Sequence, residues 1–361
     1  MYLDGSGLRK DVTEAAAWFS KAAMQGDATA QYNLGLMYAR GEGVDRSGNY
    51  AARWFRMAAE QGDAAAQYAL AGMYARGEGV GRDKNAAISW FRKAAGQGRE
   101  DAERDLRLLL EQYESPRIKS LRETAAKGDL QAQMDLGFMY GLGTGGVVRD
   151  DREAATWFRR AAELGDARAA YNLAVMYTVG EGVRHDKDEA LKFFRMAAGQ
   201  GMPQAQFVLG AFYYRGDGVV QDHGEAFGWT RGAAEQGYAP AQFNLGVMYA
   251  NGEGVGQDKA EAAKWYKKAA EQESADAQLN LAIMYYKGDG VSQDKGEAAT
   301  LLKRAAEQGN TEAQFILGNL YAQGKGVGQN TIEALKWFGK AHLSGHIEAG
   351  RFLGILGNNH D

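Results

Sequence analysis

The sequence contains no cysteine among its 361 residues. This absence excludes disulfide bonds, thiolate metal sites and a cysteine nucleophile. It does not fix the cellular compartment, because a chain without cysteine tolerates either redox state. Proline is also rare, with three residues. Pro203 and Pro240 fall in the first turn of expected helices, where proline is tolerated, whereas Pro116 is expected to stop a helix.

The sequence also lacks long apolar runs and an excess of positive charge. No stretch of about 18 apolar residues occurs, so no transmembrane helix and no membrane insertion are predicted. Lysine and arginine number 42 against 46 aspartate and glutamate residues, for a net charge of −4. A broad phosphate-binding surface needs clustered positive charge, so nucleic acid is not an expected partner.

Glycine, in contrast, is abundant, and most of its 49 residues recur at fixed positions. The segment from Ala241 to Gln272 reads AQFNLGVMYANGEGVGQDKAEAAKWYKKAAEQ. Closely similar segments open at Ala205 and Ala277, each 36 residues away (241 − 205 and 277 − 241). Self-similarity at such a period is typical of a repeat array.

Each repeat predicts two helices. In the first helix, Ala241, Leu245 and Met248 lie on one face, and Gly246 beside them would let a neighbouring backbone come close. Gly252 is expected to end this helix in a left-handed conformation. Asp258 is expected to begin the second helix as its N-cap, in a capping box with Glu261. Neither helix can bury its apolar stripe alone, so the copies must stack.

The repeated pattern A-x-x-x-L-G-x-x-Y-x-x-G-x-G-V-x-x-D-x-x-x-A-x-x-W-[FY]-x-x-A-A-x-x-G resembles the Sel1-like repeat, a family related to tetratricopeptide arrays. The resemblance implies an all-α fold, an α/α solenoid superhelix, of the branch without disulfides. Each second helix contributes one large side chain at the tryptophan position, which we expect to link two adjacent units. All seven tryptophans fall at this position, and Phe193 and Leu301 fill it elsewhere: Trp18, Trp54, Trp90, Trp157, Trp229, Trp265 and Trp337.

The repeats predict the organisation of the whole chain. Residues 1–99 form N-terminal repeats, of which the first is truncated, and residues 129–345 form six further repeats. Residues 346–361 form a C-terminal capping helix and a frayed tail. Residues 100–128 lack the glycine loop and are either a degenerate repeat that still stacks or a joint between two arms. The degenerate repeat is favoured because the apolar register continues on both sides.

The first residues lack the basic and apolar regions of a signal peptide. Tyr2, Gly5, Gly7 and Leu8 align instead with the end of a first helix and its loop. We therefore expect the chain to begin inside a repeat, with its natural N-terminus and an export signal further upstream. This favours the bacterial periplasm or export over the cytoplasm.

Three short motifs could suggest chemistry, but each has a simpler interpretation. The residues from Ser292 to Lys295 fit S-x-x-K, the acylation motif of penicillin-recognising enzymes. They occupy an expected loop and N-cap, and no S-D-N or K-T-G partner occurs. The G-x-G strings follow helices in every copy and are not dinucleotide loops. His342 and His346 lack a third ligand. No catalytic site, metal site or cofactor is predicted.

The expected binding surface is the concave face, which first helices line in a curved α/α array. By resemblance to tetratricopeptide arrays, groove positions lie two, three, six, nine and ten residues after the opening alanine of each repeat. Aromatic residues there suit protein recognition, and asparagine can pair with an extended peptide backbone. The predicted contact residues are Tyr32, Asn33, Tyr68, Tyr171, Asn172, Phe207, Tyr214, Arg215, Phe243, Asn244, Asn280, Tyr286 and Phe315.

Other interpretations of these residues stay open. The aromatic residues at the second position could pack against the adjacent first helix, and cations at the tenth position are favoured near a helix C-terminus in any case. The leading hypothesis is a non-catalytic scaffold that binds a protein or peptide partner. The resemblance adds two alternatives, an immunity protein that inhibits a secreted toxin and a β-lactam-hydrolysing enzyme.

Overall fold

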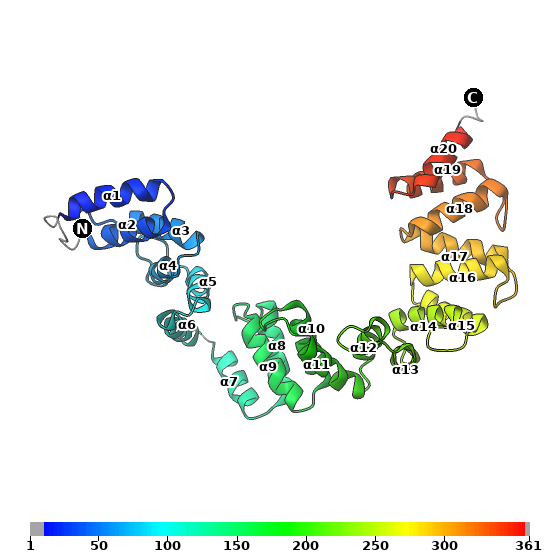
Figure 1. The fold of residues 1–361 in the computed structure, drawn as a ribbon, viewed down its shortest axis with the longest axis horizontal. Helices are drawn as coiled ribbons and strands as arrows, with labels where there is room; N and C mark the ends of the chain where they lie inside the picture. Colours follow the sequence, from blue (N-terminus) through cyan, green and yellow to red (C-terminus); the bar gives the residue numbers. More distant parts are fainter. Residues whose placement is uncertain (1–10, 114, 358–361) are drawn as a thin grey trace. The chain divides into compact units, whose positions relative to one another are not determined.

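The structure, a computed structural model, describes residues 11–113 and 115–357. Within these residues it contains twenty α-helices and no β-strand (Figure 1). Every helix in this part of the chain is too short or too polar to cross a bilayer. The predicted all-α fold is therefore confirmed. The predictions for residues 1–10 and for the tail at 358–361 lie outside the described residues.

The helices alternate between the two types that the repeat predicts. The first helices of the repeats are α2 (Ala28–Arg40), α4 (Ala64–Arg76), α6 (Glu100–Tyr113), α8 (Leu130–Leu142), α10 (Ala167–Val179), α12 (Pro203–Arg215), α14 (Ala239–Asn251), α16 (Ala275–Lys287), α18 (Thr311–Gln323) and α20 (Ile347–Gly357). The second helices are α1 (Val12–Met24), α3 (Gly48–Glu60), α5 (Lys84–Gly96), α7 (Pro116–Ala126), α9 (Asp151–Glu163), α11 (Lys187–Gly199), α13 (His223–Glu235), α15 (Lys259–Glu271), α17 (Lys295–Glu307) and α19 (Thr331–Leu343).

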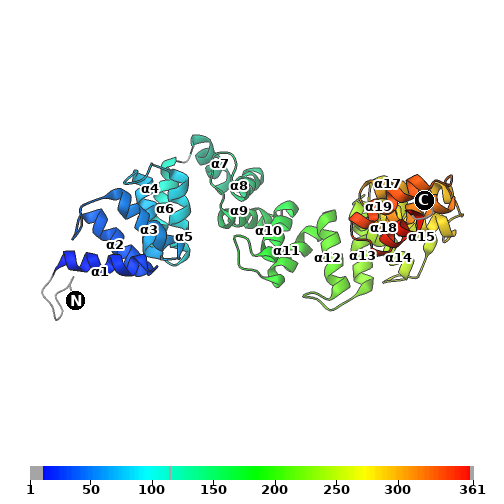
Figure 2. The same cartoon turned by 90° about the horizontal axis from the view of Figure 1, so that it is seen from above.

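The chain divides into two compact units. The first unit comprises residues 1–123 and 143–149, and the second comprises residues 124–142 and 150–361. Within the first unit, each helix from α1 to α6 packs against the next, and within the second unit the same holds from α8 to α20. Figure 2 shows this succession of helices from a second direction. Residues 100–128 form the expected helices α6 and α7, with Pro116 at the start of α7; their role as degenerate repeat or joint stays a prediction.

The glycine loop connects the two helices of a repeat as predicted, with one difference at the cap. Gly252 has a φ of 77°, and its N–H donates to the carbonyl of Met248 at 2.8 Å. The carboxylate of Asp258 accepts from the backbone N–H of Glu261 at 2.9 Å. The N–H of Asp258 itself donates across the hairpin to the Tyr249 carbonyl at 2.9 Å. The second bond of the expected capping box is thus replaced by a bond that ties the second helix to the first.

In most of the regular repeats the most deeply buried aromatic residue follows the tryptophan position. Tyr266 is 4% exposed, whereas Trp265 is half-buried and Trp18 is 54% exposed. A Cβ built on Gly246 would lie 2.7 Å from Cδ1 of Tyr266. This glycine therefore makes room for a ring and not for a neighbouring backbone, which corrects the sequence prediction. Trp265 packs on a cluster formed by α13 of the preceding repeat and α14 of its own repeat, and so links two units as expected.

Buried glutamines form a further link between repeats that the sequence analysis did not anticipate. Gln278 is fully buried in α16. Its side-chain amide donates to the Ala270 carbonyl of the preceding repeat at 3.2 Å and accepts from Gln308 at 2.9 Å. Both hydrogen-bonding ends of this amide are thereby satisfied, as burial of a polar group requires. Gln242 makes the equivalent bonds to Ala234 and Gln272.

Glu273 stands where the other regular repeats have glycine, and its backbone adopts a left-handed conformation that a side chain disfavours. It is the only non-glycine residue with positive φ, 62°, among the described residues. We expect Glu273→Gly to raise the melting temperature by roughly 2 °C, because it relieves a left-handed conformation that side chains disfavour. The ion pair of Glu273 with Arg304 (2.7 Å) would be lost, but an exposed pair contributes little. A thermal melt of both proteins, with Arg304→Ala as control, measures the change; a lower melting temperature for Glu273→Gly would refute it.

Candidate functional site

The predicted aromatic residues at the second position are half-buried. Five of them contact the second helix of their own repeat, whereas the ring of Phe207 contacts Tyr238, the N-cap of α14 in the next repeat, at 5.5 Å. The ring centroids of Tyr32 and Phe55 lie 5.7 Å apart, and those of Tyr171 and Phe194 are also 5.7 Å apart. Tyr68, Phe243 and Phe315 contact second-helix rings at 5.6–5.8 Å in the same way. These side chains therefore have a packing role. Two of them also contact the adjacent first helix: the Tyr68 hydroxyl donates to Asp105 in α6 at 2.7 Å, and the rings of Phe315 and Phe352 in α20 lie 5.7 Å apart.

The four predicted asparagines differ in their surroundings. Asn244 is exposed, and Asn172 is half-buried. Asn33 donates to the carbonyl of Thr29 within α2 at 2.9 Å. Asn280 forms a side-chain hydrogen bond with Tyr266 of the preceding repeat, which partly offsets the effect of burial; burial raises the pKa of Tyr266 to about 12. Asn280 thus has a structural partner, whereas Asn244 has its side chain directed to solvent.

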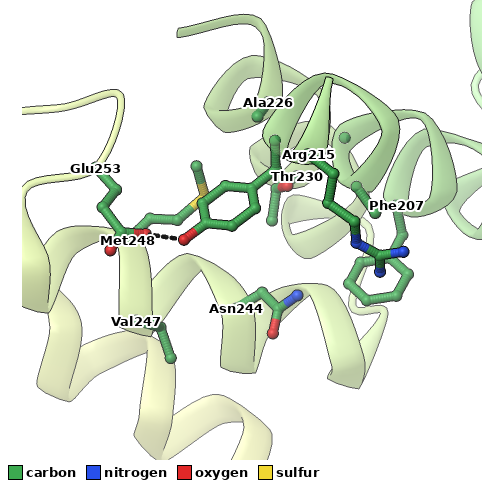
Figure 3. Close-up of a pocket in the computed structure, with 11 residues that line it drawn as sticks. Phe207, Arg215, Ala226, Thr230, Asn244, Val247, Met248 and Glu253 are labelled. Atoms are coloured by element: carbon green, nitrogen blue, oxygen red, sulfur yellow. Dashed lines mark hydrogen bonds between the residues drawn. The ribbon is translucent and has the colours of Figure 1, made fainter. Parts of the chain in front are cut away.

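Four predicted contact residues surround one cavity, which we call the Thr230 pocket. Phe207, Tyr214, Arg215 and Asn244 line it, together with Thr230, and its volume is about 270 Å³. Its walls come from α12, α13 and α14 of the second unit. Figure 3 shows Glu253 at one end of the pocket, Phe207 and Arg215 at the other, and Asn244 between them on α14.

The Thr230 pocket has an apolar floor and a polar rim. Thr230 is 5% exposed, and Val247 and Met248 contribute apolar surface. At the rim the hydroxyl of Tyr214 donates to the Glu253 carboxylate at 2.8 Å. This hydrogen bond raises the pKa of Tyr214. A pocket of this kind can enclose an apolar group and orient it through a few polar contacts.

A second cavity of about 450 Å³, the Leu302 pocket, lies between α16, α17 and α18 of the same unit. The predicted contact residue Tyr286 borders it, together with Lys287, Leu302, Ile316 and Asn319. The amine of Lys295 lies 5.7 Å from the Tyr286 ring centroid. The pocket is more apolar than the first, since Leu302 replaces Thr230 and Ile316 replaces Asn244.

The two pockets occupy equivalent positions in two different repeats. Gly210, Tyr214, Arg215 and Thr230 line the first pocket, and Ala282, Tyr286, Lys287 and Leu302 line the second. Each residue of the second group follows its counterpart by 72 positions (282 − 210, 302 − 230), which is two repeats. The two cavities therefore occupy equivalent places in these two repeats.

Both of these repeats lack an aromatic ring after the tryptophan position, a departure that the sequence analysis did not identify. In the other regular repeats this position holds Phe55, Phe91, Phe158, Phe194, Tyr266 and Phe338. Here it holds Thr230 and Leu302. Alignment of the copies shows both departures, but only the structure shows that Thr230 and Leu302 each border a cavity.

The structure gives the short motifs structural roles. Asp294, within the S-x-x-K match, is the N-cap of α17 and accepts from the Gly296 and Glu297 N–H groups at 2.9 Å. His346 stacks on Phe315 with centroids 4.2 Å apart. Among residues 11–113 and 115–357, no three histidine, cysteine, aspartate or glutamate side chains gather closely enough to hold a metal ion.

Comparisons with known proteins agree with this architecture. No curated protein matches the chain. A crystal structure of a Sel1 repeat protein from Oxalobacter formigenes is 33% identical, with 94% of this chain and 89% of that one covered and a TM-score of 0.57. The c5321 structure, a protective antigen of uropathogenic Escherichia coli with an SLR fold, is also 33% identical, over 99% of this chain and 86% of that one, with a TM-score of 0.48.

An immunity protein of Pseudomonas aeruginosa, Pa5087, is 20% identical over 67% of this chain and 83% of its own, with a TM-score of 0.34. This likeness is too low to bear on function, so the toxin-inhibitor hypothesis stays a prediction. The Sel1 repeat model matches nine segments, 1–27, 28–63, 64–98, 130–166, 167–202, 203–238, 239–274, 275–310 and 311–346. With this match over nearly its whole length, the chain belongs to the Sel1 repeat family.

Proposed function

We propose that this protein is a non-catalytic scaffold that binds an extended segment of a partner protein along its first helices. The observation that carries the proposal is the Thr230 pocket, where Phe207, Tyr214, Arg215 and Asn244 meet around an open cavity. Tyrosine, phenylalanine and arginine are the residues that dominate binding energy at protein interfaces. The repeat scaffold itself is typical of proteins that bind other proteins.

The asparagines supply the polar part of this surface. An asparagine side chain offers one acceptor oxygen and two donor hydrogens, which match the carbonyl and N–H of an extended backbone. Asn244 is exposed in α14 and Asn172 is partly exposed in α10. Neither lies on the apolar stripe that the hairpin buries, so their replacement leaves the packing of the repeats unchanged.

We expect the double replacement Asn172→Ala and Asn244→Ala to weaken partner binding by about tenfold without loss of helicity, because two hydrogen bonds of about 1 kcal/mol or less each are removed. Asn280→Ala is measured separately, since its hydrogen bond to Tyr266 gives it a structural role. The partner is captured from source-cell lysate with the chain as bait, and its affinity is then measured with purified components by calorimetry.

The matched control is the double replacement Asn49→Ala and Asn85→Ala, which makes the same chemical change at exposed positions of the second helices α3 and α5. It should leave the affinity unchanged. An equal loss of affinity in both double variants would reject the proposed surface. A partner whose contacts map entirely to second helices would reject it as well. Turnover of a small molecule by the chain would reject the non-catalytic role.

A further inference from the structure

We propose that the Thr230 pocket and the Leu302 pocket are paired sites for two aromatic side chains of one extended partner segment. This inference rests on the proposed scaffold function and names the chemistry of the segment that it binds. It follows from the shape of the two cavities, from the residues at their rims and from their matching positions in the array.

The shape argument starts from the repeats that keep the ring. A Cβ built on Gly35, Gly246 or Gly318 would lie 2.7–2.8 Å from the nearest ring carbon of Phe55, Tyr266 or Phe338, respectively. The ring in these repeats therefore occupies the space directly beside the first helix.

In the Thr230 repeat, a Cβ built on Gly210 would lie 2.7 Å from the hydroxyl oxygen of Thr230. Threonine is smaller than phenylalanine, so Thr230 leaves part of the ring's space unfilled, and this space adds to an open cavity of about 270 Å³. Leu302, which is 1% exposed, stands at the same position beside a cavity of about 450 Å³. Both cavities have the surroundings that receive an aromatic ring elsewhere in this chain.

The rim of each pocket carries a tyrosine that the other regular repeats lack. Nine residues after the opening alanine, the two repeats have Tyr214 and Tyr286. The remaining regular repeats have only small residues there: Ala39, Ala75, Gly141, Thr178, Ala250 and Ala322. Tyr214 is 40% exposed and bonded to Glu253, so its ring borders the cavity without filling it. An exposed ring at the mouth offers edge-to-face contact to an incoming ring.

A cation follows each of these tyrosines, Arg215 in the first pocket and Lys287 in the second. Both side chains are exposed. A cation near the face of an aromatic ring attracts it, and this attraction does not act on an aliphatic side chain. The rims therefore favour phenylalanine, tyrosine or tryptophan over leucine or valine as the inserted residue.

The positions of the pockets set the spacing of the two rings. They are two repeats apart in the same unit. One segment that reaches both pockets must therefore cross the helices of two repeats. An extended chain advances about 3.3 Å per residue, so the two aromatic residues should be separated by several positions, at one preferred spacing.

The test uses synthetic fluorescein-labelled peptides in which two phenylalanines are separated by increasing numbers of serine and glycine residues. We expect fluorescence anisotropy to show the tightest binding to the full chain at one preferred separation of several positions, with weaker binding at shorter and longer separations. Binding should there be at least tenfold tighter than for a peptide with one phenylalanine, because the second ring binds at a high effective concentration. A peptide with two leucines at the same separation should bind more weakly.

Two variants are designed to fill the cavities with a larger side chain of the protein itself. Thr230→Phe and Leu302→Phe restore the residue that other repeats carry, and each should reduce the affinity of the two-phenylalanine peptide to that of the single-phenylalanine peptide. The double variant should abolish binding. Gly35 already faces Phe55 in the same arrangement, so the filled variants should fold, with unchanged circular dichroism and an equal or higher melting temperature. Thr300→Phe adds a ring on the exposed face of α17 and serves as the control that keeps full affinity.

The inference is overturned if no peptide of the series binds, if affinity is independent of the separation, or if the filled variants bind as tightly as the parent chain. A pocket that takes free phenol without any preference for two-ring peptides would identify a small-molecule site instead. A natural partner that loses affinity on replacement of Asn172 and Asn244 but not in the filled variants would leave the proposed scaffold function intact and reject this inference alone.

Discussion

Replacement of Gly254 with alanine is expected to lower the free energy of unfolding by about 3 kcal/mol, as the sum of a left-handed backbone penalty and a steric clash. Gly254 lies in the loop between α14 and α15, with a φ of 72°. An added Cβ would lie 1.9 Å from the carbonyl oxygen of His223, the first residue of α13 in the preceding repeat. The loop of one repeat therefore rests on the backbone of its neighbour, and a side chain at this position separates the two.

Two other glycines allow these two effects to be measured separately. Gly218 has nearly the same φ, 74°, but an added Cβ there would meet only Leu191, at 4.0 Å. Gly218→Ala should therefore show the backbone penalty alone, about 1–2 kcal/mol. Gly256 has open space around it and no positive φ, so Gly256→Ala should change stability little. Urea unfolding and hydrogen exchange across α13–α15 measure the three variants; equal losses at Gly218 and Gly254 would contradict the clash.

Phe194→Ala is expected to lower the free energy of unfolding by about 3–5 kcal/mol, the usual range for removal of a buried phenylalanine side chain. Phe194 is buried in α11, and its ring contacts Tyr171 in α10 at 5.7 Å and Phe212 in α12 at 5.8 Å. The substitution thus removes a contact inside one repeat and another between two repeats. Because each repeat depends on its neighbours, hydrogen exchange should accelerate in α10, α11 and α12 before it does so in α18.

Two further variants make this result specific. Phe194→Leu should recover most of the loss, since leucine at position 302 is accommodated in the equivalent place. Val220→Ala, at a highly exposed loop position, should leave the unfolding curve unchanged. A loss below about 1 kcal/mol for Phe194→Ala would mean that the ring after the tryptophan position does not hold the repeats together.

The backbone of this fold could be predicted from the sequence because each signal is local. The glycine that ends a first helix, such as Gly252, and the aspartate that begins the next, such as Asp258, act within a few residues of themselves. The period between copies then required that the hairpins stack, since the apolar stripe of one helix pair has no partner inside the pair. The helix types, the loop positions and the family could therefore be predicted from the sequence alone.

The candidate site depends on contacts between residues far apart in the chain. The rings of the second-position residues Tyr32 and Tyr171 lie on Phe55 and Phe194, and their role as contact residues stays a prediction. A helical wheel could not show this, because the partner ring belongs to another helix and its rotamer is set by packing. Asn280 likewise bonds to Tyr266 across the repeat boundary.

The sequence by itself determined the helices, their caps, their period and the family, because these follow from hydrogen bonds and apolar patterns that span a few residues. Only the tertiary structure decided which side chains are enclosed and which are free. It did so because a cavity needs walls from several elements, and three different helices contribute lining residues to each of the cavities beside Thr230 and Leu302.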